Sequence, residues 1–175
     1  MIDHLTDQKP DNGFEKPIRI DDISPRPKSY TVVFPENALQ KVAHRLETES
    51  ASSVEASFEI SRSGQIILIE GHVKAQLVRT CVTSLEPMDE GIDDDFSFEL
   101  EVVDEVPDLA GEVEIDIEAP DPITGDTIDL AEQAVQQVSL AMEPFPRKEG
   151  AEPVKDEAEQ PSLSPFASLK SLKQD

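Results

Sequence analysis

The pattern that most constrains this fold is a period-two alternation of apolar and polar side chains in the first half of the chain. Apolar residues occupy every second position from Val54 to Ile60, as in a strand that buries one face. Residues 61–64 supply a turn, and Ile66 to Val78 predict the returning strand of an antiparallel hairpin. The same alternation from Phe96 to Val102 predicts a third long strand. A meander is the simplest way to connect them.

An amphipathic helix is predicted before the hairpin. The stretch from Ser29 to Phe34 is rich in β-branched and aromatic residues, which favours a strand. Pro35 then suits the first turn of a helix, because the N–H that proline lacks is not needed there. Apolar residues follow at helical spacing and indicate a helix from Pro35 to Leu46.

A second helix is predicted late in the chain. Asp129 is followed three residues later by Glu132, which has the form of a capping box. Apolar residues then form a continuous face over residues 130–141. Pro144 and Pro146 end the helix, because proline lacks a backbone donor. We expect this helix to lie across the sheet.

These elements predict an α+β fold in which an antiparallel sheet is packed by two short helices, with a partly closed barrel as the structural alternative. Residues 1–16 lack periodicity, and we expect them to form a disordered N-terminus. Residues 17–148 are expected to form a single domain, and residues 149–175 a flexible C-terminal tail.

Two further segments carry weaker patterns. Residues 103–125 are acidic and contain prolines and glycines, which favours an irregular excursion with a short strand from Val113 to Ile117. Residues 164–173 have apolar side chains three positions apart. Such a segment can dock on a partner as a helix or fold back on the chain's own sheet.

The charge of the chain is concentrated in its middle. The net charge is −23, and residues 80–146 contain 20 acidic side chains and no Lys or Arg. Such a segment repels phosphate backbones, because proteins bind nucleic acid largely through Lys and Arg, and we expect no DNA partner. A basic protein is its natural partner, and the alternative is a solvated face that only keeps the protein soluble. The residues singled out for binding a basic partner are Asp93, Asp94, Asp95, Glu99 and Glu101.

The chain shows no signal for export or for crossing a membrane. It has no run of about 18 apolar residues, and its N-terminus lacks the basic and apolar regions of a signal peptide. Its single cysteine, Cys81, cannot form an intramolecular disulfide. We therefore expect a cytoplasmic protein without a membrane partner.

Two segments of the chain resemble a known family. Gly71 to Pro87 has the pattern of an alternating strand that enters a cysteine turn, and Ile128 to Lys148 that of a capped helix stopped by two prolines. In this order they resemble the YceD family of large ribosomal RNA accumulation proteins, over roughly residues 18–169. The residues that match the family's motifs are Arg79, Cys81, Leu85, Glu86, Pro87, Pro144, Pro146, Arg147 and Lys148.

The resemblance implies a function and marks a departure from the family. It implies a non-enzymatic factor in bacterial large ribosomal subunit biogenesis that supports the synthesis, processing or stability of 23S ribosomal RNA. Many relatives carry a second cysteine where this chain has Ser84, and some add a cysteine-rich segment where it has residues 143–148. Four thiolate ligands for zinc cannot be assembled here, so we expect no metal and no cofactor. Cys81 is most simply a small buried apolar group, with turn formation or thiol chemistry as alternatives.

No motif for catalysis is present in the sequence. His4, His44 and His72 fall in different predicted elements, without a nucleophile elbow or a glycine-rich phosphate loop. The acidic run at residues 93–95 does not match the spacing of a calcium loop, and on a strand Asp94 faces away from its two neighbours. We therefore expect that the protein is not an enzyme.

Basic residues in the first third of the chain are candidates for direct RNA contact. Residues 16–45 contain six basic and three acidic side chains. They could gather on one face opposite the acidic segment, or remain ordinary surface charge. The candidates are Lys16, Arg19, Arg26, Lys28, Lys41 and Arg45.

The split in charge suggests a mechanism for the implied role. The acidic segment would mimic phosphate density and hold a basic ribosomal protein until RNA displaces it, while the early basic residues or Arg147 touch the 23S ribosomal RNA precursor. The alternative function is an acidic protein-interaction scaffold unrelated to ribosomes, in which residues 164–173 recruit one partner.

Overall fold

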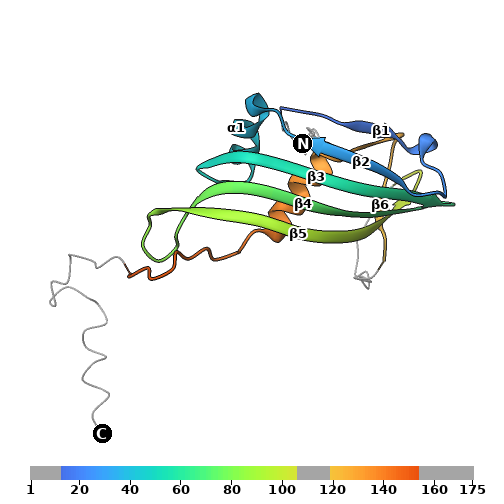
Figure 1. The fold of residues 1–175 in the computed structure, drawn as a ribbon. Helices are drawn as coiled ribbons and strands as arrows, with labels where there is room; N and C mark the ends of the chain where they lie inside the picture. Colours follow the sequence, from blue (N-terminus) through green and yellow to red (C-terminus); the bar gives the residue numbers. More distant parts are fainter. Residues whose placement is uncertain (1–12, 106–118, 154–175) are drawn as a thin grey trace, which may run out of the picture.

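Seven strands and two α-helices form the part of the chain that the computed structural model describes, residues 13–105 and 119–153 (Figure 1). In chain order the elements are β1 (Pro17–Arg19), the 3₁₀ helix η1 (Ile20–Asp22), β2 (Lys28–Val33), α1 (Glu36–Arg45), β3 (Ser50–Ser63), β4 (Ile66–Thr80), β5 (Pro87–Val102), β6 (Asp121–Ile123), β7 (Thr127–Asp129) and α2 (Leu130–Ala141). No helix in these ranges is long and apolar enough to cross a membrane.

A five-stranded sheet in the order β2-β3-β4-β5-β6 is the body of the fold. The first four strands are antiparallel neighbours and form the predicted meander, whereas the short β6 joins β5 in parallel orientation. β1 and β7 form a separate two-stranded antiparallel sheet. The predicted α+β fold is confirmed, and the described strands form an open sheet rather than a closed barrel.

The predicted alternation divides the sheet into an inner face and a solvent face. Val54, Ala56, Phe58 and Ile60 of β3 are buried, and the polar residues between them are exposed. Their partners on β4, from Ala75 to Ile69, continue the same apolar face because directly paired residues point the same way.

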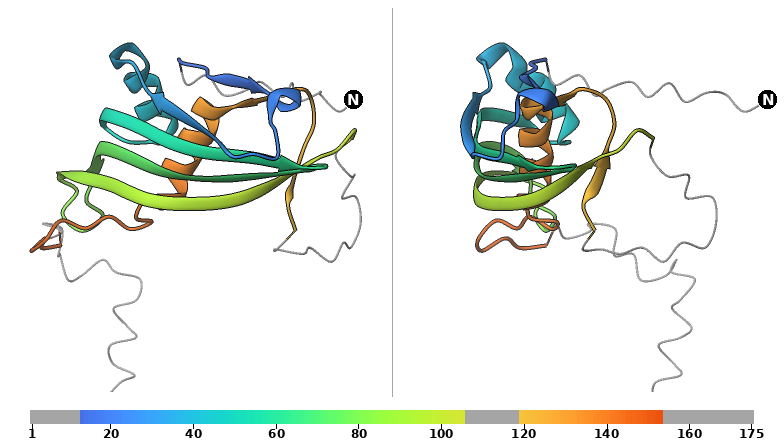
Figure 2. Two further views of the ribbon diagram at one scale, coloured as in Figure 1. Left: turned by 45° about the vertical axis from the view of Figure 1, so that its right-hand side comes forward. Right: turned by 90° about the vertical axis from the view of Figure 1, so that its right-hand side faces the viewer.

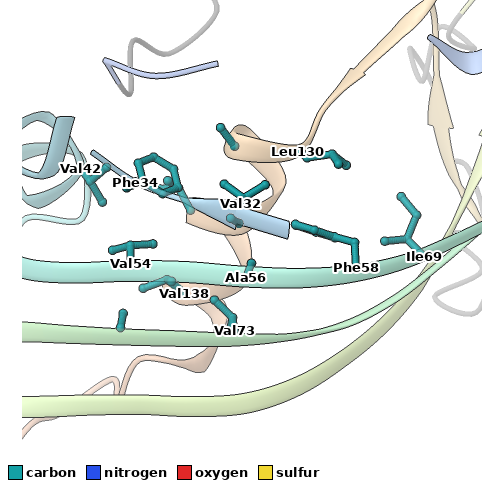
Figure 3. Packing of buried hydrophobic residues seen from close by; sticks show 14 of the residues in the cluster. Val32, Phe34, Val42, Val54, Ala56, Phe58, Ile69, Val73, Leu130 and Val138 are labelled. Atoms are coloured by element: carbon teal, nitrogen blue, oxygen red, sulfur yellow. The ribbon is translucent and has the colours of Figure 1, made fainter. Parts of the chain in front are cut away.

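The helix α2 crosses the inner face of the sheet, as predicted (Figures 1 and 2). It contacts β1, β2, β3, β4 and β5. Leu130 and Val138 are fully buried, and Figure 3 shows them in the same cluster as Phe58 and Val73 of the sheet. Full burial of a side chain of this kind contributes about 1.5–3 kcal/mol. The α2 contacts therefore hold the long strands together from one side.

A close approach between neighbouring strands depends on Gly71 of β4. Gly71 pairs with Phe96 of β5, and a Cβ added to Gly71 would lie 2.5 Å from Cζ of Phe96 and 2.2 Å from the carbonyl oxygen of Ser57. Because glycine has no Cβ, the Phe96 ring lies across β4 and meets Phe58 edge to face, with 5.4 Å between the ring centroids.

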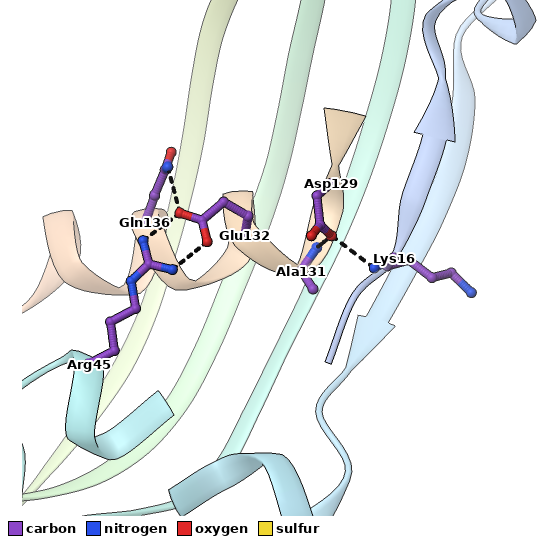
Figure 4. Close-up of polar contacts among 6 residues, drawn as sticks. All are labelled: Lys16, Arg45, Asp129, Ala131, Glu132 and Gln136. Carbon is purple, nitrogen blue, oxygen red and sulfur yellow. Dashed lines mark hydrogen bonds and ion pairs between the residues drawn. The ribbon is translucent and has the colours of Figure 1, made fainter. Parts of the chain in front are cut away.

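Contacts that hold the N-terminal part of the chain begin before β1. Phe14 packs edge to face on Phe34, with 5.5 Å between centroids. The backbone N–H of Lys16 donates to Oδ1 of Asp129 at 2.8 Å, and its carbonyl oxygen accepts from the N–H of Leu130 at 3.0 Å (Figure 4). The packed region thus extends to the N-terminal side of residue 17, where the domain was expected to begin.

The two predicted helices are confirmed, and the third strand is longer than predicted. α1 lies within the expected range, with Pro35 as the residue just before its first turn. β5 begins at Pro87, well before the alternation that starts at Phe96. Residues 1–12, the strand expected within residues 113–117 and the docking segment at 164–173 lie outside the described residues.

Candidate functional site

Two segments that are far apart in the sequence, Gly71–Pro87 and Ile128–Lys148, come together at one end of the sheet (Figure 1). The first contributes the Cys81 turn, residues 81–86, and the second the C-terminal arm, residues 142–148. The N–H of Val82 donates to the carbonyl oxygen of Pro146 at 2.9 Å. The N–H of Lys148 donates to Sγ of Cys81 at 3.3 Å, and its Nζ lies 3.2 Å from a carboxylate oxygen of Glu86. Segments far apart in the sequence therefore build one structure.

The Cys81 turn is closed by its own backbone. The N–H of Cys81 donates to the carbonyl oxygen of Glu86, and the N–H of Leu85 donates to the carbonyl oxygen of Cys81, both at 2.9 Å. The backbone of Leu85 has φ of 58°, a left-handed conformation that residues other than Gly, Asn and Asp seldom adopt. Its side chain is nonetheless 66% exposed, so the turn presents an apolar group to solvent.

Cys81 lies fully buried inside this turn, as predicted for a packing role. Its Sγ accepts hydrogen bonds from the N–H groups of Lys148 at 3.3 Å and Ser84 at 3.5 Å. Hydrogen bonds from the Ser84 hydroxyl and from these backbone groups lower the pKa of the thiol from 9.0 to about 6, and burial opposes this only in part. The sulfur is therefore a hydrogen-bond acceptor that joins the turn to the arm.

A largely buried ion pair supports the turn from the adjoining strands. Nη1 of Arg79 on β4 lies 2.6 Å from a carboxylate oxygen of Glu90 on β5, and these side chains are only 14% and 11% exposed. The same nitrogen donates to the carbonyl oxygen of Glu143 at 2.8 Å, and the N–H of Glu143 donates to Glu90 at 2.8 Å. Arg79 and Glu90 thus anchor the start of the arm. We call Arg79, Glu90, the Cys81 turn and residues 143–148 the motif cluster.

The nine motif residues divide by exposure within the motif cluster. Arg79, Cys81 and Pro146 face inward, whereas Leu85, Arg147 and Lys148 are exposed. Phe145 is also exposed, to 69%, between the two prolines of the arm. Glu86, Pro87 and Pro144 are exposed as well. The inward members join backbone segments, and the outward members offer apolar and basic groups for a contact.

The acidic residues chosen for binding a basic partner lie on β5, on two faces. Asp93, Asp95, Glu99 and Glu101 pair with the solvent-face residues of β4, whereas Asp94 pairs with Val73 and lies on the inner side. Asp94 thus faces away from its neighbours, as predicted. It is still exposed, because it lies along the edge of the sheet.

Part of this acidic surface is balanced by cationic or polar groups of β4. Nε2 of His72 lies 2.9 Å from Asp93, and Nδ1 of His72 lies 2.6 Å from Asp95. Nζ of Lys74 lies 3.3 Å from the second oxygen of Asp93. Glu99 and Glu101 pair instead with Leu68 and Ile66, which carry no charge. The negative charge is therefore less balanced toward the C-terminal end of β5.

The six candidates for RNA contact occupy different elements. Lys16, Arg19, Arg26, Lys28 and Lys41 have exposed side chains in the segments from β1 to α1. The sixth, Arg45, is half buried, and its guanidinium forms two hydrogen bonds with the carboxylate of Glu132 on α2 (Figure 4). Glu132 also accepts from Gln136 at 2.8 Å. Arg45 therefore ties α1 to α2.

Sequence reasoning missed the acidic partners of Arg45 and Arg79, which are both partly buried. Glu90 lies on the inner side of β5 two residues before the buried Ile92, and a charged residue at an apolar position signals a buried partner. Glu132 was predicted as the second member of a capping box. Asp129 does cap α2 by accepting from the N–H of Ala131 at 3.1 Å, and Glu132 binds Arg45.

In residues 13–105 and 119–153, no three His, Cys, Asp or Glu side chains are placed to hold a metal ion together. Buried polar side chains in these ranges all have hydrogen-bond partners. Comparisons with protein-family models, with curated proteins and with solved structures find no match for this chain.

Proposed function

We propose that this protein is a non-enzymatic factor in bacterial large ribosomal subunit biogenesis that supports the accumulation of 23S ribosomal RNA. The observation that carries the proposal is the motif cluster. The segments that resemble the YceD family are separated in sequence, yet Val82 bonds to Pro146 and Cys81 to Lys148. A shared structural unit gives a physical reason for both segments to occur in one chain.

The proposed mechanism uses the acidic solvent side of β5 to hold a basic ribosomal protein. Asp95, Glu99 and Glu101 are aligned along one strand, and no Lys or Arg occurs between residues 80 and 146. Such a row attracts a cationic partner and slows non-specific contact with phosphate. The precursor RNA would then compete for the same cationic partner and release it.

The exposed basic groups provide a second, separate contact in this proposal. Arg147 and Lys148 are exposed in the motif cluster, as are Leu85 and Phe145, and Lys148 pairs with Glu86. A surface that carries both cations and an exposed aromatic ring suits a single-stranded RNA base and its phosphate. The RNA contact is thus proposed at the motif cluster and at the exposed lysines and arginines from β1 to α1.

The first experiment measures ribosomal RNA in cells depleted of this protein. We expect a fall in mature 23S relative to 16S ribosomal RNA, with a rise in 23S precursors. Re-expression of the intact chain is the control and restores the ratio. If depletion removes the protein completely and the ratio of 23S to 16S ribosomal RNA stays unchanged, the proposal is contradicted.

The second experiment tests the acidic side of β5 in a gentle pull-down. A variant with Asp93, Asp94, Asp95, Glu99 and Glu101 changed to the corresponding amides should lose basic ribosomal proteins from the bound fraction. The matched control changes the same kind of charge at exposed positions outside β5, namely Asp22, Glu36, Glu47, Glu149 and Glu152. Equal loss in both variants, or no loss in either, contradicts the β5 mechanism.

A second candidate function is an acidic scaffold unrelated to ribosomes. The apolar side chains of Leu85 and Phe145, exposed to 66% and 69%, favour it because they suit a protein contact. Recovery of a single non-ribosomal protein that is lost from a Leu85→Ser and Phe145→Ser variant supports the scaffold. Recovery of ribosomal proteins with 23S precursor RNA supports the biogenesis factor.

A further inference from the structure

One long edge of the sheet is open in the part of the chain that the structure describes. β5 pairs with β4 over nearly its full length, from Pro87 to Glu101. On its other side, β6 pairs only with Leu100 to Val102. Residues 87–99 therefore form a free border of the described sheet, seen along the lower rim in Figure 1.

The hydrogen-bond pattern identifies which residues of β5 face this open edge. The N–H of Val102 donates to Gln65 on the β4 side, and the N–H of Val103 donates to Ile123 of β6. Consecutive residues of a strand turn their backbone groups to opposite sides, and the register with β4 is continuous. The backbone groups directed to the open edge belong to Asp89, Gly91, Asp93, Asp95, Ser97 and Glu99.

The two rows of side chains beside the edge differ in character. On the solvent side they are acidic at Asp93, Asp95 and Glu99, of which Asp93 and Asp95 also contact His72 or Lys74 of β4. On the inner side, Phe96 and Phe98 are only partly buried, although they pack against the core. A strand added here would therefore meet negative charge on one face and partly covered aromatic rings on the other.

These charges restrict what can pair with the edge. A second copy of β5 would place acidic rows side by side, which is destabilising. Natural edge strands often carry charge that prevents such pairing. A strand with Lys or Arg on one face is attracted by the same acidic side chains. Hydrogen bonds between the two backbones supply the remaining affinity, as when extended peptides add to a sheet.

We propose that the open edge of β5 binds an extended, basic segment of a partner protein as an added strand. The segment has Lys or Arg at alternate positions, facing Asp93, Asp95 and Glu99, and apolar side chains between them, covering Phe96 and Phe98. The identity of the partner rests on the proposed function, because the segment is assigned to the basic ribosomal protein.

The test uses the full chain and a blocked octapeptide of alternating lysine and valine. Titration is followed by NMR, and amide signals should shift at the edge-facing residues from Asp89 to Glu99 more than at Glu55 and Glu59 on the solvent face of β3. A peptide of the same sequence with every amide N-methylated keeps its charge but cannot donate hydrogen bonds from its backbone. We expect it to bind at least about tenfold more weakly, the effect of losing one or two net hydrogen bonds.

A pair of protein variants tests the same edge from the other side. The N–H of Ser97 points to the open edge, so Ser97→Pro removes an edge donor and leaves the β4 ladder intact. We expect Ser97→Pro to weaken binding of the unmethylated peptide several-fold and Ser97→Ala to leave it unchanged. If Ser97→Pro fails to fold, the comparison of the two peptides on the unaltered chain still decides the question.

Three results overturn the inference. Equal affinity for the methylated and unmethylated peptides means that charge alone holds the peptide. Slow amide exchange at the edge-facing residues of the free monomer means that the chain covers its own edge. Dimerisation that protects these amides means that a second copy occupies it. None of these results changes the outcome of the ribosomal RNA experiment. An unchanged ratio of 23S to 16S ribosomal RNA would rule out the proposed partner, but binding of the peptide to the edge could still be measured.

Discussion

The motif cluster and the open edge of β5 adjoin each other, yet they are built in opposite ways. In the motif cluster, Arg79, Glu90 and Cys81 direct their polar atoms to other parts of the chain, and the Arg79 and Glu90 side chains are 14% and 11% exposed. Along the edge, Asp95 and Glu99 are exposed, and alternate backbone groups have no partner in the described residues. Hydrogen bonds and ion pairs within the motif cluster stabilise the fold, whereas the backbone groups that lack a partner at the edge are available to bind another strand.

The largest effect that separates the two regions is expected from Arg79→Ala. The change leaves the largely buried Glu90 without its cation and removes the donor to Glu143, and breaking a buried pair of this kind costs about 3 kcal/mol. Lys74→Ala is the matched control on the same strand, because its pair with Asp93 is 51% and 65% exposed and is worth less than about 1 kcal/mol. Urea unfolding measures both. Equal losses contradict the distinction between anchored and open regions.

A somewhat smaller effect is expected from Gly71→Ala at the centre of the sheet. The new Cβ collides with the Ser57 carbonyl and the Phe96 ring, and such overpacking costs about 1–3 kcal/mol. Gly91→Ala, on the edge strand, is the control. Its nearest contact is the Gln76 amide at 3.1 Å, on a side chain that can move. Thermal unfolding compares the two variants, and a greater loss at Gly91 contradicts the packing described here.

A smaller, pH-dependent difference is expected between the unaltered chain and Cys81→Ala. The thiol pKa is lowered from 9.0 to about 6 in the folded protein, so between these values the unfolded chain retains a proton that the folded chain has lost. Raising the pH from 6 to 9 should therefore stabilise the unaltered chain relative to the variant, and the advantage disappears as the pH falls through 6. Urea midpoints at several pH values measure it.

The Ser84 hydroxyl provides the control for this pH dependence. Because the hydrogen bond from this hydroxyl is the largest cause of the lowered pKa, Ser84→Ala should reduce the change of stability with pH without removing the thiol. A difference between the unaltered chain and Cys81→Ala that stays constant from pH 6 to 9 shows that the sulfur accepts these bonds without ionising.

The smallest effect on folding is expected from Leu85→Asn. The side chain is 66% exposed, and Asn adopts the left-handed conformation of this residue more readily than Leu does. The free energy of unfolding should therefore change by less than about 0.5 kcal/mol. If the Leu85→Asn variant no longer recovers the partner in a pull-down while its free energy of unfolding is unchanged, Leu85 belongs to a contact surface. A loss of stability above 1 kcal/mol would instead assign it to the fold.

Much of the fold could be predicted because its signals are local. The alternation at Val54 to Ile60 and the helical face of residues 130–141 each reflect a period set by backbone geometry. The start of β5 was missed because Glu90 and Asp94 interrupt its apolar side. An edge strand tolerates an exposed Asp94 on that side, since no further strand covers it there in the described residues.

The candidate site was only partly predictable. Arg79, Cys81 and Lys148 could be selected from the resemblance, but Glu90 and Glu143, which bond to Arg79, were not. Arg45 was assigned to RNA because it is basic and lies on a helix. Its pairing with Glu132, 87 positions away in sequence, has no local signal.

The sequence by itself determined the class of the fold, the order of the long strands, the capped helix α2 and the concentration of negative charge in residues 80–146. These depend on side-chain periodicity, backbone propensity and composition, which are properties of neighbouring residues. Only the tertiary structure decided that Arg45 and Arg79 hold elements together, that the Cys81 turn meets the C-terminal arm and that β5 keeps an open edge. Each of these depends on which distant residues come within hydrogen-bond distance, and that is set by the packing of the whole chain.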